Sequence, residues 1–196
     1  MSNSNRKFGW IALLVGLYLL VTFALVRSSG GRGGGDWEFP ASWYWHDTDA
    51  QRLAHAELLG KSMPWLELSD WRNGEITSDD LKGKVVVLDF WATWCGPCLA
   101  AVPQTNALYA KYHRQGLEVI AVCTSTGQES YGQVVQTHQM QYPTARDPSG
   151  QVAQAWRVMW YPTYAVVDRK GIVRAVGLGG ERLEAVVGML LDEPAG

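Results

Sequence analysis

The stretch that decides the fold is Asp89-Phe90-Trp91-Ala92-Thr93-Trp94-Cys95-Gly96-Pro97-Cys98. It follows Val85–Leu88, four apolar residues that predict a buried strand, and a helical pattern begins within a few residues of it. We therefore expect Cys95 at the N-terminus of a helix that continues to about Gln115, with Cys98 one turn further on the same face. Unpaired N–H groups and the helix dipole favour negative charge there, and C-x-x-C frames lower thiol pKa values from about 8.5 to between about 3.5 and 7.5. The sequence therefore predicts a reactive thiol pair.

The placement of the two cysteines predicts thiol–disulfide exchange. Cys95, expected to be exposed, attacks a substrate disulfide and forms a mixed disulfide, which the more buried Cys98 then resolves. The same steps in reverse oxidise a dithiol. Because Cys98 must lose its proton during resolution, Asp89 at the end of the buried strand is the predicted proton acceptor. Pro97 suits the first helical turn, whereas Pro103 lies deeper and is expected to kink the helix.

The cysteine segment resembles thioredoxin over more than the C-x-x-C spacing. The acid at Asp89, the aromatic residues before the cysteine pair and the helix-kinking Pro103 all stand at matching places. Tyr161-Pro162-Thr163, before a predicted strand, resembles the cis-proline loop of that family. The region from about Gly60 to Leu191 is similar to the TlpA/ResA-type thioredoxins, which are tethered to bacterial membranes and face outward. Further matching pieces are Leu66-Glu67-Leu68, Asp80-Leu81-Lys82-Gly83-Lys84, and Tyr142-Pro143 leading to Asp147-Pro148-Ser149-Gly150.

The resemblance implies the thioredoxin fold, an α/β architecture whose central mixed sheet is flanked by helices. It also implies a thiol–disulfide oxidoreductase that acts on protein thiols and disulfides and uses no cofactor or metal. The redox-active disulfide is expected between Cys95 and Cys98, with Asp89 as the third catalytic residue. The substrate-binding residues that it implies are Trp94, Gly96, Pro97, Tyr161 and Pro162, of which Pro162 is expected to be cis.

Two positions depart from the family pattern. Many membrane-tethered relatives carry a glutamate three residues after the second cysteine, where this chain has Ala101. We therefore expect proton transfer to depend on Asp89 alone. Tyr161 is larger than the small or β-branched residue that is common before the cis-proline, which changes the expected shape of the substrate groove.

Strand and helix patterns alternate from Met63 onward. The predicted strands are Trp65–Leu68, Val85–Phe90, Leu117–Cys123, Thr163–Val167 and Ile172–Val176. The last two are joined by the polar turn Asp168-Arg169-Lys170-Gly171, which predicts an antiparallel hairpin. The predicted helices lie near Cys95–Gln115, Ser130–Gln139, Gln151–Trp156 and Glu181–Leu191. This alternation predicts a mixed sheet with helices on both faces, in one thioredoxin-like domain over residues 61–196.

The N-terminal segment carries a candidate membrane span. Residues 8–26 hold no charge, and as a helix they would extend roughly 28 Å, close to a hydrocarbon core of about 30 Å. We predict a single transmembrane anchor there, after a tail of residues 1–7 and before a flexible Gly-rich tether of residues 27–35. A cleaved signal peptide is the alternative, but the run exceeds the usual length and no A-x-A-like site follows it.

Residues 36–60 form a Trp-rich extension before the domain. It holds Trp37, Trp43 and Trp45, followed by a short amphipathic segment with Gly60 as its expected end. One helical face of that segment is expected to carry Ala50, Leu53, Ala54 and Leu58. We expect the extension to cover the core of the domain, with a position near the membrane surface as the alternative.

The composition excludes some classes of function. The chain has 196 residues, of which 47% are hydrophobic and 18% charged, and its formal net charge is -2. Because no basic face is indicated, nucleic acid is not an expected partner. Three cysteines are too few for a scaffold held together by disulfides.

Other interpretations of the cysteine pair stay open. Zinc would need two ligands besides Cys95 and Cys98, for which the candidates are Cys123, His46, His55, His113 and His138, but the chain has no second C-x-x-C. Leu99 excludes haem attachment, because C-x-x-C-H needs histidine there. A peroxiredoxin-like peroxidase would need a T-x-x-C frame, which this turn lacks, and an intact pair argues against a non-enzymatic scaffold. Cys123 itself is predicted to be a small buried hydrophobic residue.

The residues between the cysteines bear on the direction of electron flow. Gly96-Pro97 matches the reducing thioredoxin, so we favour reduction of disulfides in exported proteins. A membrane electron donor would then have to keep the pair reduced. The anchor, a weak positive-inside bias and the resemblance together predict a single-pass protein of the bacterial cell membrane. Its C-terminal domain is expected to face the periplasm or the cell exterior.

Overall fold

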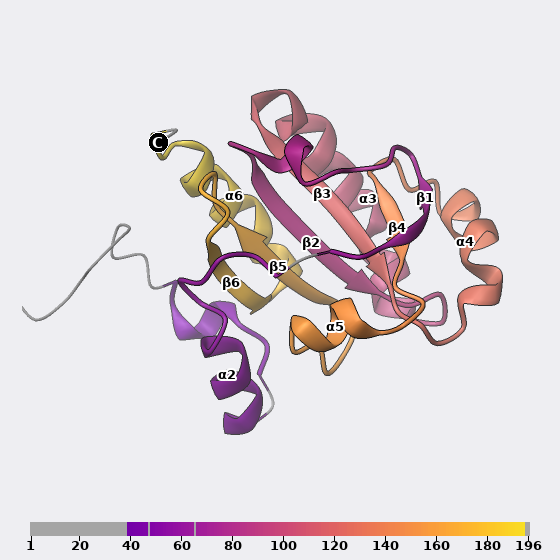
Figure 1. The fold of residues 1–196 in the computed structure, drawn as a ribbon, viewed down its shortest axis with the longest axis horizontal. Coiled ribbons are helices and arrows are strands. Elements are labelled where there is room, and N and C mark those ends of the chain that lie inside the picture. The colour runs from indigo at the N-terminus through magenta and orange to yellow at the C-terminus, as the bar shows by residue number, and fades with distance from the viewer. Residues whose placement is uncertain (1–38, 47, 65, 195–196) are drawn as a thin grey trace, which may run out of the picture. The chain divides into compact units, whose positions relative to one another are not determined.

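The computed structural model describes residues 39–46, 48–64 and 66–194, whose arrangement Figure 1 shows. The predicted tail, anchor and tether and the start of the Trp-rich extension fall in residues 1–38, outside the described residues. In the part of the chain that the structure describes, no helix is long and apolar enough to cross a membrane.

One mixed sheet organises the described residues (Figure 1). Its strands are β1 (Ser69–Arg72), β2 (Val85–Trp91), β3 (Leu117–Cys123), β4 (Thr144–Arg146), β5 (Thr163–Val167) and β6 (Val173–Leu178). Their order across the sheet is β1-β4-β3-β2-β5-β6. The pairs β2–β3 and β3–β4 are parallel, whereas β1–β4, β2–β5 and β5–β6 are antiparallel. The predicted mixed sheet is confirmed.

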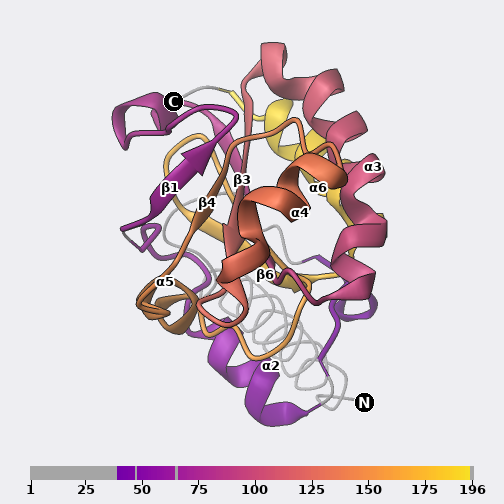
Figure 2. The same ribbon diagram turned by 90° about the vertical axis from the view of Figure 1, so that its right-hand side faces the viewer.

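Helices cover both faces of this sheet, as the alternation of elements predicts. They are α2 (Asp49–Ala56), α3 (Gly96–Tyr112), α4 (Tyr131–Thr137), α5 (Gln151–Ala155) and α6 (Leu183–Leu191). Figure 2 shows α3 and α6 on one side of the strands and α5 on the other. Apolar side chains of α3, α4 and α6 share a core with one face of the sheet, and those of α5 share a second core with the opposite face.

The central strand β2 divides its side chains between the two cores. Every residue of β2 is buried, and successive side chains of a strand point to opposite faces. Val85, Val87 and Trp91 belong to the core under α3, whereas Leu88 and the other even-numbered residues belong to the core under α5. The same alternation places Asp89 on the α3 face, the side on which the helix carries the cysteines.

One strand prediction was wrong in position, and one strand was missed. Residues 66–68 have no regular structure, and β1 begins only at Ser69. Leu66 and Leu68 pack against the second core without joining the ladder, so their alternating pattern reflects burial rather than strand pairing. β4 was not predicted because it has only three residues, too few to produce a periodic pattern.

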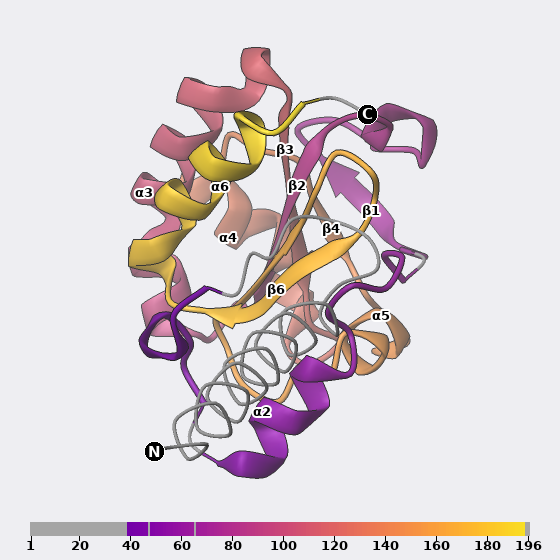
Figure 3. The ribbon, with the colours of Figure 1, turned by 90° about the vertical axis from the view of Figure 1, so that its left-hand side faces the viewer.

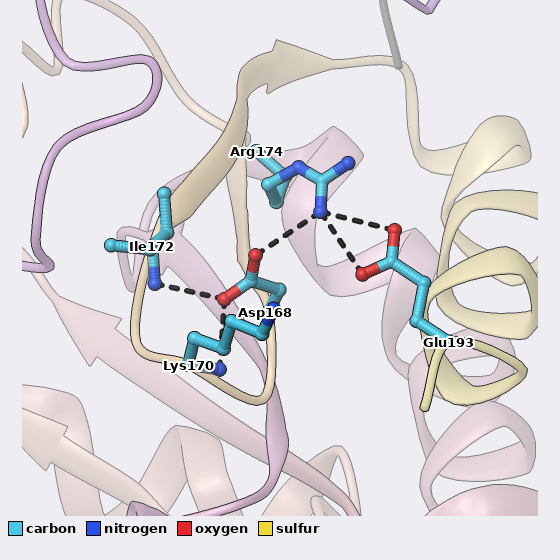
Figure 4. A network of polar contacts seen from close by, with 5 residues as sticks. All are labelled: Asp168, Lys170, Ile172, Arg174 and Glu193. Atoms are coloured by element: carbon cyan, nitrogen blue, oxygen red, sulfur yellow. Dashed lines mark hydrogen bonds and ion pairs between the residues drawn. The ribbon is translucent and has the colours of Figure 1, made fainter. Parts of the chain in front are cut away.

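The predicted hairpin between β5 and β6 is confirmed, and a polar network closes it (Figure 4). One oxygen of Asp168 accepts backbone N–H bonds from Lys170 and Ile172, at 2.9 and 3.0 Å. Its other oxygen lies 3.1 Å from the guanidinium of Arg174, which also pairs with Glu193 just after α6. These contacts join the hairpin turn to the C-terminal helix.

The Trp-rich extension lies along β6, the strand at the edge of the sheet. Tyr44 forms an antiparallel bridge with Leu178, at one end of β6, and Ser62, two residues after the extension, forms another with Ile172, just before the start of β6. Between these bridges, α2 packs beside β6 (Figure 3). An unpaired edge strand invites pairing with other chains, so this cover protects the sheet. The prediction that the extension covers the domain is confirmed for its described part.

The buried face of α2 differs from the predicted one. A capping box between Thr48 and Gln51 starts the helix, as expected for a Thr before an amphipathic segment. However, Leu53 is exposed, and His55 is instead the buried residue of the helix. The apolar pattern failed here because His55 is buried by contacts outside the helix, with His46 before it and with Trp160, which is distant in sequence.

Candidate active site

The two cysteines form a disulfide across the N-terminus of α3. Their Cα atoms are 5.3 Å apart. Cys95 is the N-cap residue, and the backbone N–H of Cys98 donates to its sulfur at 3.2 Å. This N–H belongs to the first helical turn, which lacks partners inside the helix, so it would stabilise a thiolate on Cys95. The predicted helix start is therefore confirmed.

The two cysteines differ less in exposure than expected. Cys95 is 4% exposed and Cys98 is 5% exposed, so the predicted contrast between an exposed attacking thiol and a buried resolving thiol is wrong for this disulfide form. Gly96 and Pro97, between them, are both exposed. Pro97 occupies the first turn and Pro103 lies inside α3, both as predicted.

Asp89 is buried on the α3 face of β2 without full hydrogen bonding. It is 5% exposed, and its Oδ1 has no hydrogen-bond partner among the described residues. Burial raises the pKa of this carboxyl from 3.8 to about 7. Its register partner on the adjacent strand β5 is Tyr164. The pKa of Tyr164 is raised mainly by burial and also by the nearby charge of Asp89. A carboxyl with a pKa near neutrality can take up a proton at working pH.

The predicted cis-proline loop lies beside the cysteine turn. The Tyr161–Pro162 peptide bond is cis, as predicted. The ring of Tyr161 meets Trp94 edge-on, with centroids 5.9 Å apart. Trp94 is 59% exposed although it directly precedes Cys95, whereas Pro162 is buried. Trp94 and Tyr161 thus form an aromatic wall at the disulfide, where a bound polypeptide could lie.

A loop after β3 holds this wall in place and was not predicted. Thr93 donates from Oγ1 to the carbonyl of Gly127 at 2.6 Å, and Trp94 donates from Nε1 to the carbonyl of Thr126 at 3.3 Å. Gly127 has φ +76°, and a Cβ there would lie 2.9 Å from Cδ1 of Trp94. The contact of Gly127 with Trp94 could not be predicted from the sequence, because the two residues lie more than thirty positions apart.

Residues 59–176 match the model of the family described as AhpC/TSA. The chain belongs to the AhpC/TSA family. The matched segment contains the cysteine pair, the buried acid and the cis-proline loop, which are the parts that the structure brings together.

Three relatives of this AhpC/TSA-family chain are named as thiol–disulfide oxidoreductases or interchange proteins. The thiol-disulfide oxidoreductase ResA of Bacillus thuringiensis subsp. konkukian is 34% identical over 115 residues, which span 59% of this chain and 66% of that protein. ResA of Bacillus anthracis is 33% identical over 132 residues, 67% of this chain and 76% of that protein. A solved structure of a putative thiol:disulfide interchange protein DsbE from Chlorobium tepidum is 31% identical, with a TM-score of 0.62. It covers 68% of this chain and 97% of its own.

These relatives agree with the chemistry that the site can perform. A disulfide at a helix N-terminus can exchange with substrate thiols, and a buried carboxyl on the same face can manage protons. The domain of this AhpC/TSA-family chain is a thiol–disulfide oxidoreductase.

The other candidate ligands of a zinc site do not gather in one cluster among the described residues. His46 contacts His55, whereas His113 lies 3.8 Å from the carboxylate of Glu118. Across residues 39–46, 48–64 and 66–194, no three His, Cys, Asp or Glu side chains are grouped as metal ligands. Cys123 is fully buried, and burial raises the pKa of its thiol to about 12, as fits the predicted small hydrophobic residue.

Proposed function

We propose that this chain is a membrane-anchored reductase that transfers electrons to disulfides of exported proteins through Cys95 and Cys98. The observation that carries the proposal is the disulfide across the N-terminus of α3, beside a cis-proline loop. Gly96-Pro97 between the cysteines supports the reductive direction, because the same pair stands in reducing thioredoxin.

In the proposed cycle the reduced pair meets a substrate disulfide. The Cys95 thiolate attacks one substrate sulfur, so that the substrate disulfide breaks, a mixed disulfide forms and one substrate thiolate leaves. The Cys98 thiolate then attacks the sulfur of Cys95, which releases the second substrate thiolate. Both substrate thiolates take up protons. The substrate has gained two electrons, and the Cys95–Cys98 disulfide must be reduced by a donor dithiol.

Asp89 is proposed to take the proton of Cys98 as the mixed disulfide resolves. Burial raises its pKa to about 7, so the carboxyl is partly ionised at neutral pH and can act as a base. Because Ala101 replaces the glutamate of many relatives, no second carboxyl is proposed in this step.

The substrate is proposed to bind as an extended segment along the cis-proline loop. Backbone groups of Tyr161 would pair with it, as in strand addition at a sheet edge, and Trp94 would cover one side. Such binding uses main-chain hydrogen bonds, so many unfolded or extended protein segments would fit.

The proposed location is the bacterial cell membrane, with the domain on the outer side. The uncharged run of residues 8–26 and the weak positive-inside bias support this topology. The donor would then be a membrane protein that passes electrons outward. Fusion of alkaline phosphatase to the C-terminus should give strong activity, and fluorescence from a reporter that matures only in the cytoplasm would overturn the topology.

The reduction potential and substrate preference of the purified chain test the proposed chemistry. We expect reduction of insulin disulfides and a potential nearer to that of thioredoxin, about −270 mV, than to that of the oxidant DsbA, about −120 mV. A potential near the DsbA value would reverse the proposed direction. Rapid peroxide consumption without insulin reduction would instead indicate a peroxidase, the activity that the AhpC/TSA match leaves as the second candidate.

A further inference from the structure

The loop between α5 and β5 begins at a residue with an unfavourable backbone conformation. Arg157 lies two residues after the end of α5 and has φ +56°, a left-handed value that residues with a Cβ adopt rarely. The loop continues through Met159 and Trp160 to the cis bond at Pro162. Because such a conformation persists only when neighbouring groups hold it, the contacts of Arg157 bear on the shape of the substrate loop.

His55 of the N-terminal extension provides one of these contacts. Its side chain is buried, and its Nε2 lies 3.1 Å from the carbonyl oxygen of Arg157. Since a carbonyl can only accept, Nε2 of His55 carries the hydrogen. The other ring nitrogen, Nδ1, lies 3.1 Å from Nε2 of His46. In neutral His55 that Nδ1 is an acceptor, so His46 donates and holds His55 in the tautomer that the Arg157 carbonyl requires.

The same two histidines pack against Trp160, the residue before Tyr161 and Pro162 of the substrate loop. Trp160 meets His55 at a centroid distance of 5.3 Å and His46 edge-on at 6.3 Å. The carbonyl of Trp160 in turn accepts a 2.7 Å hydrogen bond from the hydroxyl of Thr163, which closes the turn around Pro162. A continuous set of contacts therefore joins the extension to the loop that carries Tyr161.

We propose that His55 is a positioning residue for the cis-proline loop and that His46 sets its tautomer, so that the N-terminal extension belongs to the substrate-binding apparatus. This inference rests on the proposed function, since it assigns the loop a role in capturing protein disulfides. Gly177 makes the arrangement possible, because a Cβ at that position would lie 2.7 Å from Nδ1 of His55.

The arrangement has a pH dependence whose sign follows from the charges around it. Burial lowers the pKa of both histidines, and the Arg52 charge lowers that of His46 further, while the Arg157 carbonyl opposes the fall for His55. The other charged groups nearby are exposed: Asp49 pairs with Arg52, and Glu57 pairs with the Arg157 side chain. A proton on Nδ1 of His55 would turn that acceptor into a donor that faces the N–H of His46, so acid that protonates His55 should break the contact between the two rings.

The remaining groups packed on the pair are neutral. The ring of Tyr44 stacks on His46 at 5.5 Å, and the carbonyl of Val176 lies near His55. Neither changes charge between pH 5 and 8. Because the pKa values of both histidines are lowered from the ordinary value of about 6.5, substrate capture should hold steady above that pH and weaken only at a lower pH.

Kinetics of the full-length chain with two substrates test this role. Insulin disulfides need the loop, whereas 5,5′-dithiobis(2-nitrobenzoic acid) reaches the thiol without it. His55→Ala should raise KM for insulin about five- to tenfold, the effect of one buried hydrogen bond, and leave the reaction with the small disulfide within about twofold. His55→Gln keeps an N–H that can reach the Arg157 carbonyl, so it should restore most of the KM and abolish the acid effect. His138→Ala, at an exposed histidine, is the matched control.

Hydrogen exchange separates failure of this inference from failure of the proposed function. Backbone amides of residues 158–161 and of Thr163 should exchange faster in His55→Ala than in the parent or in His138→Ala, whatever the substrate. A parent that reduces only the small disulfide would overturn the proposed function, and exchange would still decide the role of His55. Unchanged exchange together with unchanged KM in His55→Ala would overturn the inference itself.

Discussion

Two buried aspartates lie towards opposite ends of the sheet, and their surroundings differ in one respect. Asp89 is near the C-terminal end of β2, and Asp168 follows β5, beside the start of β2. Asp89 and Asp168 are both 5% exposed. Both oxygens of Asp168 have partners, in the backbone of the hairpin turn and the Arg174 guanidinium (Figure 4). Asp89 has an oxygen without a partner among the described residues, and burial raises its pKa to about 7. Equal burial therefore produces a structural carboxylate where partners are present and a proton acceptor where they are absent.

Changes to the cysteine pair should have the largest effect on disulfide reduction. Cys95→Ser should abolish disulfide reduction, because the attacking sulfur is gone. Cys98→Ser should leave attack intact and prevent release, so mixed disulfides with substrates should accumulate. Alkylation trapping followed by non-reducing gels measures both, and Cys123→Ser serves as a control with little effect. Equal complexes from all three variants, or none from Cys98→Ser, would reverse the assignment of the two thiols.

Asp168→Ala, in the turn after β5, should give the largest loss of stability. It removes one of the two carboxylate partners of a largely buried guanidinium, and it removes the acceptor of two backbone N–H groups, so we expect a loss of about 3 kcal/mol. Urea unfolding measures it. Lys170→Ala is the control, because only the backbone N–H of Lys170 contacts Asp168.

Activity completes the test of Asp168. Disulfide reduction per folded molecule should remain near the parent value in Asp168→Ala, because this carboxylate lies at the end of the sheet away from the cysteines. A variant that kept its stability, or one that folded but lost activity, would remove the distinction between the two aspartates.

Asp89→Asn should stabilise the protein, with a sign opposite to that of Asp168→Ala. The folded pKa of Asp89, about 7, lies above the unfolded value of about 3.9, so ionisation costs the native state stability progressively as pH rises between these values. The variant should therefore match the parent near pH 4 and exceed it above pH 7. We expect a gain of about 2 kcal/mol, since a buried amide also lacks full hydrogen bonding. Unfolding curves across this pH range measure it.

The same variant tests the kinetic role of Asp89. Stopped-flow measurements should show the first attack by Cys95 nearly unchanged and the resolution by Cys98 slowed by about tenfold or more, the lower range for loss of a general base. An Asn variant that resolves at the parent rate, with no gain in stability above neutral pH, would place Asp89 with Asp168 among structural residues.

The part of the site around Asp89 and the cysteine pair could be predicted from the sequence, because its residues lie close together in the chain. The buried strand, the helix start at Cys95 and the acid at Asp89 all lie within fourteen consecutive residues, Val85 to Cys98. The cis bond before Pro162 followed from a resemblance that three residues carry. Strand β2 and helix α3 then place these groups on one face without further information.

The contacts that hold this part of the site in place could not be predicted from the sequence, because the contacting residues are distant in the chain. His55 is buried by contacts with Arg157 and Trp160, about one hundred residues away, and a lone histidine in an amphipathic segment carries no sign of them. The low exposure of Cys95 likewise depends on tertiary packing. Short elements such as β4 have too few residues for a periodic pattern.

Two glycines with the same backbone angle allow the smallest predicted effect, a change in KM, to be separated from the cost of backbone strain. Gly127 at the aromatic wall and Gly171 in the hairpin both have φ +76°. A Cβ at Gly171 would meet nothing within 4 Å, whereas at Gly127 it would lie 2.9 Å from the Trp94 ring. Each change to Ala should cost about 1 kcal/mol through the left-handed backbone alone, as measured by urea unfolding. Only Gly127→Ala should move Trp94, so it alone should raise KM for insulin, by about two- to threefold, the effect of weakening one aromatic contact. If both variants raised KM equally, or neither did, the loop after β3 would be a structural connection with no part in substrate capture.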